Sequence, residues 1–385
     1  MDTTDRSSSQ PFNVVIAGGS VAALEAAFAL RDLAGENVHV TLVAPNTEFV
    51  YRPMSVREPF ALGAAGRCRL AKIANDIGVE LITDSLSWLD AAQRVVHIEG
   101  AARLKYDALL LALGARPRRR YPHAVTLDDA RLDDILHGLI QDIEGGYVRH
   151  VAFVIPGEFA WPLPVYELAL MTAGRAHDMN IDLAVTIITP EANPLAVFGD
   201  GASSAVARLL HEHAITTITS ARCEVPHSRQ VVINPGDRRL EADRVVVLPE
   251  LRGPSVRGLK AGFRGFIPVD AHCKVRGVER VYAAGDATDF AVKHGGIAAQ
   301  QADTAARAIA ALAGVDIDPK PLDPVIRGIL LTGGKPRYLT AHLIAGHSSH
   351  SQISDTPTWS PPTKIAARYL APYLDEHGVS APIVV

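Results

Sequence analysis

The chain has 385 residues, of which 48% are hydrophobic and 21% charged, and its formal net charge is −4. This length suffices for two or three domains with cores of their own, and the composition is that of a globular α/β protein. The nearly balanced charge gives no reason to expect nucleic acid as a partner, and no apolar run approaches the roughly 18 residues that a membrane span requires. The polar, serine-rich start of the chain predicts a disordered leader, not a signal peptide.

The three cysteines, Cys68, Cys223 and Cys273, lie far apart and form no C-x-x-C pair. This spacing argues against a disulfide scaffold or a cysteine-rich metal site, and it suits a reducing cytoplasm. His347 and His350 are close together, but they lie in a serine- and glycine-rich stretch that predicts a flexible loop. We therefore expect no metal site and a cytoplasmic protein, with peripheral attachment to a membrane as the alternative.

The first elements in chain order form a β-α-β unit. The apolar run 13–17 predicts a buried parallel strand, 22–33 a helix and 38–43 the next strand. The turn between the first strand and the helix reads Gly18-Gly19-Ser20. Such a turn lets a pyrophosphate approach the backbone and rest on the helix N-terminus, whose N–H groups favour an anion. The unit therefore predicts a dinucleotide site, and the alternative is a glycine-rich turn that binds nothing.

This turn departs from the usual G-x-G-x-x-G pattern. Ser20 and Ala23 stand at its second and third glycine positions. Alanine at the third position still allows close packing of helix on strand, whereas Ser20 puts a side chain where the phosphates come nearest. Its hydroxyl could donate to a phosphate. The acidic residue that usually binds the ribose is also replaced, because Ala44-Pro45-Asn46 follows the second strand, and Asn46 or a backbone group is the candidate substitute.

The later elements indicate a second α/β block inside the first. An apolar strand is expected at 108–113, and a new series begins at His150. The expected members of that series are strands at 151–155, 181–188 and 245–248 and helices at 165–176 and 202–213. The chain then returns through 281–286 to a helix at 296–313 and a proline-rich tail from Pro319. We expect an α/β fold with two Rossmann-like dinucleotide-binding domains, the second inserted into the first, plus a C-terminal extension.

The strand at 281–286 presents Asp286 at its carboxyl end, where open α/β sheets bind their ligands. A carboxylate there can accept hydrogen bonds from sugar or ribityl hydroxyls, and Gly285 permits a close approach. The alternative is an aspartate that caps the following turn. Together with the distant Gly18 turn, this strand end indicates one cofactor held between remote segments of the chain.

Three runs follow one another in order: the Gly18 turn, Leu111-Ala112-Leu113-Gly114-Ala115 and Tyr282-Ala283-Ala284-Gly285-Asp286. Together they resemble the two-dinucleotide-domain flavoproteins of the pyridine nucleotide–disulfide oxidoreductase superfamily, over about residues 12–315. The resemblance implies FAD as the cofactor, with Gly18, Gly19 and Ser20 by the pyrophosphate and Asp286 by the ribityl chain. The same likeness adds to the cofactor set Ala23, Ala112, Gly114 and Gly285.

Three further runs, 46–53, 189–199 and 293–302, are similar to segments of sulfide:quinone oxidoreductases and flavocytochrome c sulfide dehydrogenases. This likeness implies a helix whose N-terminus lies under the flavin. Lys293 and the positive end of that helix would offset the charge of the reduced flavin, and the alternative for Lys293 is a surface lysine. The cofactor contacts that the likeness implies come from Asn46, Arg52, Pro53, Gly296 and Ala298.

The chain lacks the redox cysteines of those enzymes. Trp161 stands where the sulfide-oxidising relatives carry a cysteine near the flavin, and no cysteine follows Cys273. Sulfide attack on a disulfide requires such a pair, so we expect different chemistry. Trp161 is interpreted either as core packing or a lid, or as a stacking platform for a substrate. Glu167, in a Tyr-Glu pair that lies near flavin and quinone in the relatives, is either a proton relay or an ordinary helix glutamate.

The second dinucleotide turn is altered as well, since 155–159 contains no G-x-G-x-x-G. NAD(P)H therefore remains an alternative electron donor, for which Glu191 could bind a ribose. We predict an FAD-dependent oxidoreductase that transfers hydride or electrons through the flavin, without a redox-active disulfide, to a small, quinone-like acceptor. The catalytic candidates are Glu167, Lys293 and Trp161. The alternatives are an NAD(P)H-dependent flavin reductase with an atypical nicotinamide site and a non-catalytic flavin-binding protein that acts through a partner.

The expected organisation has three parts. The FAD-binding domain comprises 11–120 and 262–318, and the second Rossmann-like domain comprises 121–261. A C-terminal interface or dimerisation region follows at 319–385. The residues that suggest a homodimer or a domain contact there are Tyr369, Leu370, Tyr373 and Leu374.

Overall fold

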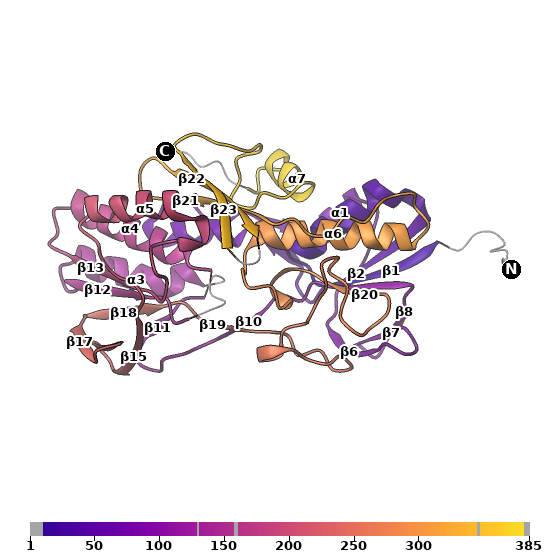
Figure 1. Ribbon diagram of the computed structural model, residues 1–385, viewed down its shortest axis with the longest axis horizontal. Coiled ribbons are helices and arrows are strands. Elements are labelled where there is room, and N and C mark those ends of the chain that lie inside the picture. Colours follow the sequence, from indigo (N-terminus) through magenta and orange to yellow (C-terminus); the bar gives the residue numbers. More distant parts are fainter. Residues whose placement is uncertain (1–10, 129–130, 158–160, 345–346, 381–385) are drawn as a thin grey trace, which may run out of the picture.

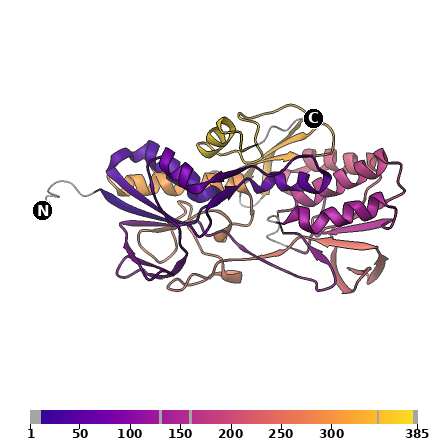
Figure 2. The same ribbon diagram turned by 180° about the vertical axis from the view of Figure 1, so that it is seen from behind.

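The computed structural model describes residues 11–128, 131–157, 161–344 and 347–380, and two five-stranded parallel sheets form its framework. The sheets lie toward opposite ends of an elongated molecule, and the C-terminal segment lies above their junction (Figure 1). Figure 2 shows the same arrangement from behind. The first sheet is completed only after the chain returns from the second, which confirms the expected α/β fold with an inserted Rossmann-like unit.

The first sheet has the order β20-β9-β1-β2-β5, and its central strands are apolar runs buried on both faces. Its members are β1 (Phe12–Ala17), β2 (Val38–Val43), β5 (Glu80–Ile82), β9 (Ala108–Leu111) and β20 (Val281–Ala283). Because every neighbouring pair is parallel, the carboxyl ends of all five strands meet at one edge.

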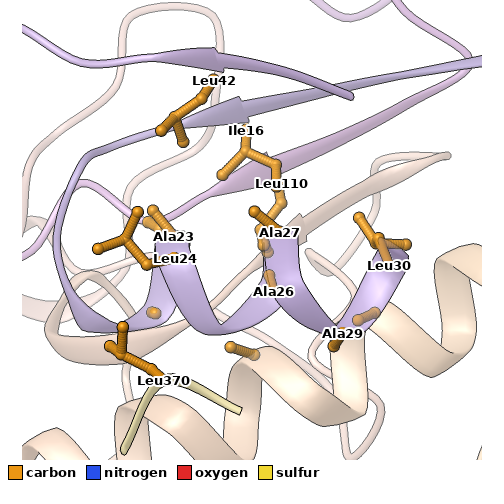
Figure 3. Packing of buried hydrophobic residues seen from close by; sticks show 14 of the residues in the cluster. Ile16, Ala23, Leu24, Ala26, Ala27, Ala29, Leu30, Leu42, Leu110 and Leu370 are labelled. Atoms are coloured by element: carbon orange, nitrogen blue, oxygen red, sulfur yellow. The ribbon is translucent and has the colours of Figure 1, made fainter. Parts of the chain in front are cut away.

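Two alanine-rich helices, α1 (Val21–Ala34) and α6 (Gly295–Leu312), pack against each other on this sheet. Figure 3 shows Ala27 of α1 facing Ile16 and Leu110 of the strands. Small side chains allow the helices and strands to approach closely. The first turns of both helices lie at the same edge of the sheet because α1 follows β1 and α6 follows β20, and these strands are parallel.

The second sheet has the order β11-β18-β12-β13-β14 and is also parallel throughout. Its strands are β11 (Val125–Thr126), β12 (His150–Val154), β13 (Ala184–Ile188), β14 (Thr216–Ile218) and β18 (Arg244–Val247). The accompanying helices are α3 (Leu132–Glu144), α4 (Leu163–Asp178) and α5 (Asp200–Glu212). The helices expected at 165–176 and 202–213 are thus confirmed to within two residues at each end.

Short antiparallel elements decorate this framework. They are β3 (Glu48–Val50) with β4 (Arg67–Arg69), β6 (Leu86–Asp90) with β7 (Val95–Ile98) and β8 (Arg103–Lys105), and β15 (Arg222–His227) with β16 (Gln230–Asn234) and β17 (Arg238–Glu241). The two crossings between the sheets pair as β10 (Arg116–Arg118) with β19 (Glu250–Arg252). The helices α2 (Leu70–Asp76) and η2 (Arg52–Phe60, a 3₁₀ helix) complete this part.

The C-terminal extension contains a sheet that the sequence did not predict. Strands β21 (Val325–Leu330), β22 (Arg337–Ile344) and β23 (His347–Ser354) pair antiparallel, so the flexible loop expected around His347 and His350 is wrong. The polar sequence of β23 carries little strand preference of its own. Its conformation comes from pairing with β22, which is a tertiary effect.

Helix α7 (Leu370–Glu376) attaches the end of the described chain to the first domain. Leu370 and Leu374 are buried in the same core as α1, and the hydroxyls of Tyr369 and Tyr373 donate to Asp32 and Asp76. These four residues therefore make a domain contact within one chain, and the homodimer stays a prediction, as do the domain bounds. None of the helices in the described part combines the length and hydropathy of a membrane span.

Candidate functional site

The three sequence runs proposed to hold a dinucleotide meet at the carboxyl edge of the first sheet. The N–H of Ala112 donates to the carbonyl of Ala17 at 2.8 Å, and that of Ala284 donates to Leu111 at 3.1 Å. The turn after β1, the turn after β9 and the turn after β20 are therefore immediate neighbours. This is the position at which open α/β sheets bind ligands.

Gly18 is required by its surroundings. Its φ is +135°, and a Cβ built there would lie 2.2 Å from the carbonyl oxygen of Ala112. Gly19 is similarly tight, because a Cβ would lie 2.8 Å from side-chain carbons of Ala44 and Leu70. The missing side chains thus allow the turn after β1 to pack against the ends of β9 and β2 and the start of α2, whether or not a ligand is bound.

The N-terminus of α1 is open to an anion. Ser20 is its N-cap, is exposed, and makes no capping hydrogen bond with its side chain. The first N–H groups of a helix have no partners within the helix, and they carry the positive end of its dipole. Ser20 thus stands at this helix end in place of a glycine, with a hydroxyl that makes no capping bond. Ala23 is buried against the sheet in the next turn.

The turn after β20 joins both helices. Gly285 has a φ of +76°, and a Cβ there would lie 3.3 Å from the Cβ atoms of Ala22 and Ala298. Its N–H donates to Oε1 of Gln301 at 2.7 Å, which holds the turn on α6. Asp286 follows and remains partly exposed. Gly114, at φ +66°, has no atom within 4 Å of its Cβ position, so the backbone there is open to close approach.

Lys293 is buried just before α6, and its Nζ donates to the carbonyl of Thr288. The same nitrogen lies 3.9 Å from the ring centroid of Phe266. Burial lowers the pKa of Lys293 to about 8, and the carboxylates of Asp286 and Asp289 partly oppose this shift. The structure therefore holds a cation beside Asp286 whose charge depends on pH in the physiological range.

Next to it stands a residue that the sequence did not single out. His294 is the N-cap of α6, and its ring lies 4.6 Å from that of Trp161, which also contacts Phe198 edge-on at 5.8 Å. Burial, together with the charge of Lys364, lowers the pKa of His294 to about 4, so the ring is neutral. Its Nδ1 has no hydrogen-bond partner among the described residues. Gly296 lies close to this ring, because a Cβ built there would be 2.9 Å from Cε1 of His294.

Glu167 lies in a buried ion pair. Its Oε1 is 2.7 Å from Nζ of Lys364, and the N–H of Leu331 donates to the same oxygen at 2.9 Å. Lys364 also donates to the carbonyl of Pro53 at 2.9 Å. Burial raises the pKa of Glu167, and Lys364 is the main opposing influence. The pair thus ties α4, the start of η2 and the C-terminal segment together, and the relay role of Glu167 stays a prediction.

The remaining expected contacts lie near the end of β2. Asn46 is exposed in the loop after that strand, and Arg52 is exposed at the start of η2. Between them, Tyr51 is buried, and its hydroxyl accepts a hydrogen bond from the N–H of Ile365 at 2.9 Å. Neither Tyr51 nor Lys364 was predicted, because each acts through a partner that lies more than 180 residues away.

The corresponding edge of the second sheet is less suited to a nucleotide. Glu191 accepts hydrogen bonds from the hydroxyls of Tyr166, at 2.6 Å, and Thr189, at 2.9 Å, so its carboxylate is already engaged. Helix α4 begins after Pro162 and carries Pro164 in its first turn, and proline supplies no N–H to a phosphate. Residues 158–160 lie outside the described part.

The cysteines are buried and form no disulfide. Burial raises the pKa of Cys223 to about 11 and that of Cys273 to about 12, and it also raises the pKa of Cys68. All three are therefore neutral thiols near pH 7, which are poor nucleophiles. Within the described residues no group of histidine, cysteine and carboxylate side chains could hold a metal ion.

A family model described as pyridine nucleotide-disulphide oxidoreductase matches residues 12–137 and 166–309 of the chain. The chain belongs to this family. It is an FAD-dependent oxidoreductase, and members of the family use FAD and NAD(P)H. The glycine turns, the open N-terminus of α1 and the strand-end aspartate of this oxidoreductase suit a dinucleotide.

Solved structures share the fold of this oxidoreductase at low identity. The sulfide:quinone oxidoreductase of Aquifex aeolicus has a TM-score of 0.79 at 17% identity, covering 89% of this chain and 86% of that one. A ferredoxin reductase for the CYP199A2 system of Rhodopseudomonas palustris has a TM-score of 0.65 at 21% identity, covering 86% and 82%. An NAD-dependent persulfide reductase of A. fulgidus has a TM-score of 0.62 at 21% identity, covering 86% of this chain and 64% of that one. No curated protein matches the chain.

Proposed function

We propose that this oxidoreductase passes electrons through FAD to a small, quinone-like acceptor without a redox-active disulfide. The proposal rests on the meeting of the Gly18, Gly114 and Gly285 turns at one sheet edge, which we call the cradle, in a chain whose three cysteines are buried and form no disulfide. FAD would supply the hydride- and electron-transfer chemistry. The likeness to a sulfide:quinone oxidoreductase in fold supports a quinone-like acceptor, while the missing thiols argue against sulfide as the donor.

The chain's own residues would have distinct roles around the cofactor. The pyrophosphate would rest on Gly18, Gly19 and Ser20 at the N-terminus of α1, with Ala23 packed below, and the ribityl hydroxyls would donate to Asp286. Ala112, Gly114 and Gly285 would allow close backbone approach. Asn46, Arg52 and Pro53 would border the cofactor from the loop after β2, and Gly296 and Ala298 from the start of α6. The meeting of the three turns at one edge of the sheet supports the assignments around Gly18, Gly114 and Gly285, and the other assignments rest on the likeness to the sulfide-oxidising enzymes.

Trp161 is suited to exclude water from the acceptor side. It stands at the place of the missing cysteine and contacts His294 at the start of α6. Its position therefore joins the second domain to the helix that would face the flavin. Glu167, by contrast, would position Lys364 and the C-terminal segment, because both of its oxygens lie within hydrogen-bond distance of that lysine.

The test starts from the absorption spectrum of the purified protein, which we expect to show the double band of oxidised flavin. Anaerobic titration with NADH, NADPH and other donors, followed by a short-chain quinone, should show reduction of the flavin and its reoxidation by the quinone. A cysteine-free variant, Cys68→Ala, Cys223→Ala and Cys273→Ala, should keep the wild-type rates. Loss of turnover in that variant with the flavin retained would contradict the proposal.

The other outcomes identify the alternatives. Prompt bleaching by NADH or NADPH with no transfer to quinones would indicate a flavin reductase. A flavin that no donor reduces would indicate a non-catalytic flavin-binding protein. A colourless protein that takes up no added FAD would show that the assignment of these residues to a cofactor is wrong.

Lys293 provides a separate prediction. Lys293→Met should lower the midpoint potential of the bound flavin by roughly 30 mV or more, a tenfold change for two electrons. The reason is that the ammonium would stabilise the negative charge that a flavin gains on reduction. Since the pKa of Lys293 is about 8, the lysine is charged below that pH, and the difference from wild type should shrink as the pH rises above 8.

Redox titration at pH 6.5 and pH 9 checks this. Lys260→Met is the matched control, because Lys260 is exposed and should leave the potential unchanged at both values. Equal potentials for wild type and Lys293→Met at pH 6.5 would exclude the role.

A further inference from the structure

A cavity lies on the opposite side of α6 from the strand ends. It has a volume of about 250 Å³ and is formed by α6, β21 and the segment around residues 359–371. Ala298 faces Gly285 and the dinucleotide edge, whereas the neighbouring Ala299 and Asp303 line this cavity. The cavity is therefore separate from the dinucleotide site, and binding of a ligand in it would be independent of the proposed function.

Two guanidinium groups line the cavity. Arg327, on β21, is half-buried, and burial lowers its pKa. Arg368 lies over the ring of Tyr369, 5.0 Å from its centroid. Among the described residues neither arginine forms an ion pair within 4.0 Å. Arg327 is partly desolvated and Arg368 is exposed at the mouth of the cavity, and a partly desolvated cation without a bound carboxylate is costly unless a ligand pairs with it.

Asp303 is the acidic group of the cavity, and its Oδ1 is buried without a hydrogen-bond partner among the described residues. Burial raises its pKa to about 8 with the help of Glu25 on α1, while Arg368 and Arg307 oppose the shift. Glu25 itself accepts three backbone N–H groups, from Arg368, Tyr369 and Leu370. The raised pKa favours the protonated form of Asp303, which can donate a hydrogen bond and leaves the positive charge of the arginines in the cavity.

The other walls are apolar. Ala299, Pro361 and Ala367 contribute carbon atoms, and Trp359 stands beside them with its indole N–H already donated to the carbonyl of Thr363 at 3.1 Å. The ring of Trp359 is thus left for apolar contact. The volume is below the range of drug-sized sites, which begins at about 300 Å³, so only a small molecule fits.

We propose that this cavity binds a small organic carboxylate, with its charged end at Arg327 and Arg368 and its apolar body against Ala299 and Trp359. A planar guanidinium matches a carboxylate in a two-pronged arrangement that a point charge does not offer. The protonated Asp303 adds a donor to the same oxygen atoms. The ligand would join α6 to the C-terminal segment.

Benzoate is a suitable probe, and benzamide, of the same shape without the charge, is its control. Isothermal titration of the full-length protein with its flavin bound should give one saturable benzoate site, with a dissociation constant in roughly the millimolar range or tighter. Benzamide should not bind, and the flavin spectrum should not change. A spectral change on adding benzoate would place it at the flavin and overturn the proposal, as would the absence of saturable binding or equal binding of benzamide.

Variants test the named groups. Arg327→Gln should weaken benzoate binding at least tenfold, whereas Arg307→Gln, which removes the same charge from a residue that does not line the cavity, should stay within twofold. Arg327→Lys keeps the charge but not the planar guanidinium, so its affinity for benzoate should lie between those of the other two variants. If Arg327→Gln does not fold, the affinity of Arg327→Lys for benzoate and the comparison with benzamide test the proposal instead. Unchanged binding in whichever of these variants folds would overturn the proposal.

Asp303→Asn tests whether ionisation of Asp303 weakens benzoate binding. It should bind benzoate like wild type at pH 7, because the asparagine also carries no charge. Wild-type binding should weaken several-fold between pH 7 and pH 9 as Asp303 ionises among Glu25, Arg307 and Arg368, and Asp303→Asn should not show this change. Equal pH profiles for the two proteins would remove Asp303 from the site.

Discussion

Gly18→Ala should abolish retention of FAD and lower the free energy of unfolding by about 3 kcal/mol or more. Two effects add at this position. The φ of +135° lies in a region that only glycine adopts at low cost, and the new Cβ would lie 2.2 Å from the carbonyl oxygen of Ala112. The new Cβ and the carbonyl oxygen of Ala112 are both fixed by the backbone, so no side-chain rotation can relieve the clash. The turn after β1 must therefore move away from the end of β9, which opens the cradle. The flavin-to-protein ratio after gel filtration and urea unfolding measure the two losses.

Gly378→Ala is the matched control. Gly378 also has a positive φ, +65°, but no atom lies within 4 Å of its Cβ position, and it follows α7 at the surface. Its substitution should cost only about 1 kcal/mol and leave the flavin bound. A Gly18→Ala protein that retains stoichiometric flavin and unfolds like Gly378→Ala would show that the turn has no part in holding the cofactor.

Lys364→Met should lower the free energy of unfolding by about 3–5 kcal/mol. The reason is that Glu167 would be left buried without its partner, since Lys364 is the main group that opposes the effect of burial on its pKa. The double variant with Glu167→Met should recover much of the loss, because no charge then remains in the core. Urea unfolding of the two single variants and the double variant gives the coupling between them.

The pH dependence of the Lys364→Met variant has a defined sign. The folded-state pKa of Glu167 is raised, so the folded state binds this proton more tightly than the unfolded state. The stability that the proton provides is present at low pH and is lost as the pH rises through the folded-state pKa. The free energy of unfolding of Lys364→Met should therefore lie closer to that of wild type at pH 5 than at pH 8. A defect of the same size at both values would indicate that lost packing, not the unpaired carboxylate, is responsible.

The first β-α-β unit and the strand just before the Gly285-Asp286 turn were predictable because their signals are local, although the strand ends at Ala283 and not at Asp286 as expected. An apolar run of strand length, a glycine turn and a helix follow within about 30 residues, and each is encoded by its own neighbours. Parallel strands also align their carboxyl ends by construction. The meeting of the Gly18, Gly114 and Gly285 turns at one edge could therefore be expected before the structure was known.

The residues that were missed depend on contacts between distant segments. Lys364 gives no signal in a proline-rich tail, yet it ends as the buried partner of Glu167. His294 is one of 15 histidines, and only the packing of Trp161 against α6 makes it a buried, neutral ring. The strand β23 was not predicted, since its pairing with β22 is what holds it.

By itself the sequence determined the α/β class, the inserted second unit and the dinucleotide edge, because strand length, glycine turns and strand-end carboxylates act over short distances. Only the tertiary structure decided which ionisable groups are charged and which are paired. Burial and the identity of the nearest partner set those states, and both come from segments that meet across the fold. The roles of Lys293, Glu167 and Asp303 differ for that reason, although each is an ordinary charged residue in the chain.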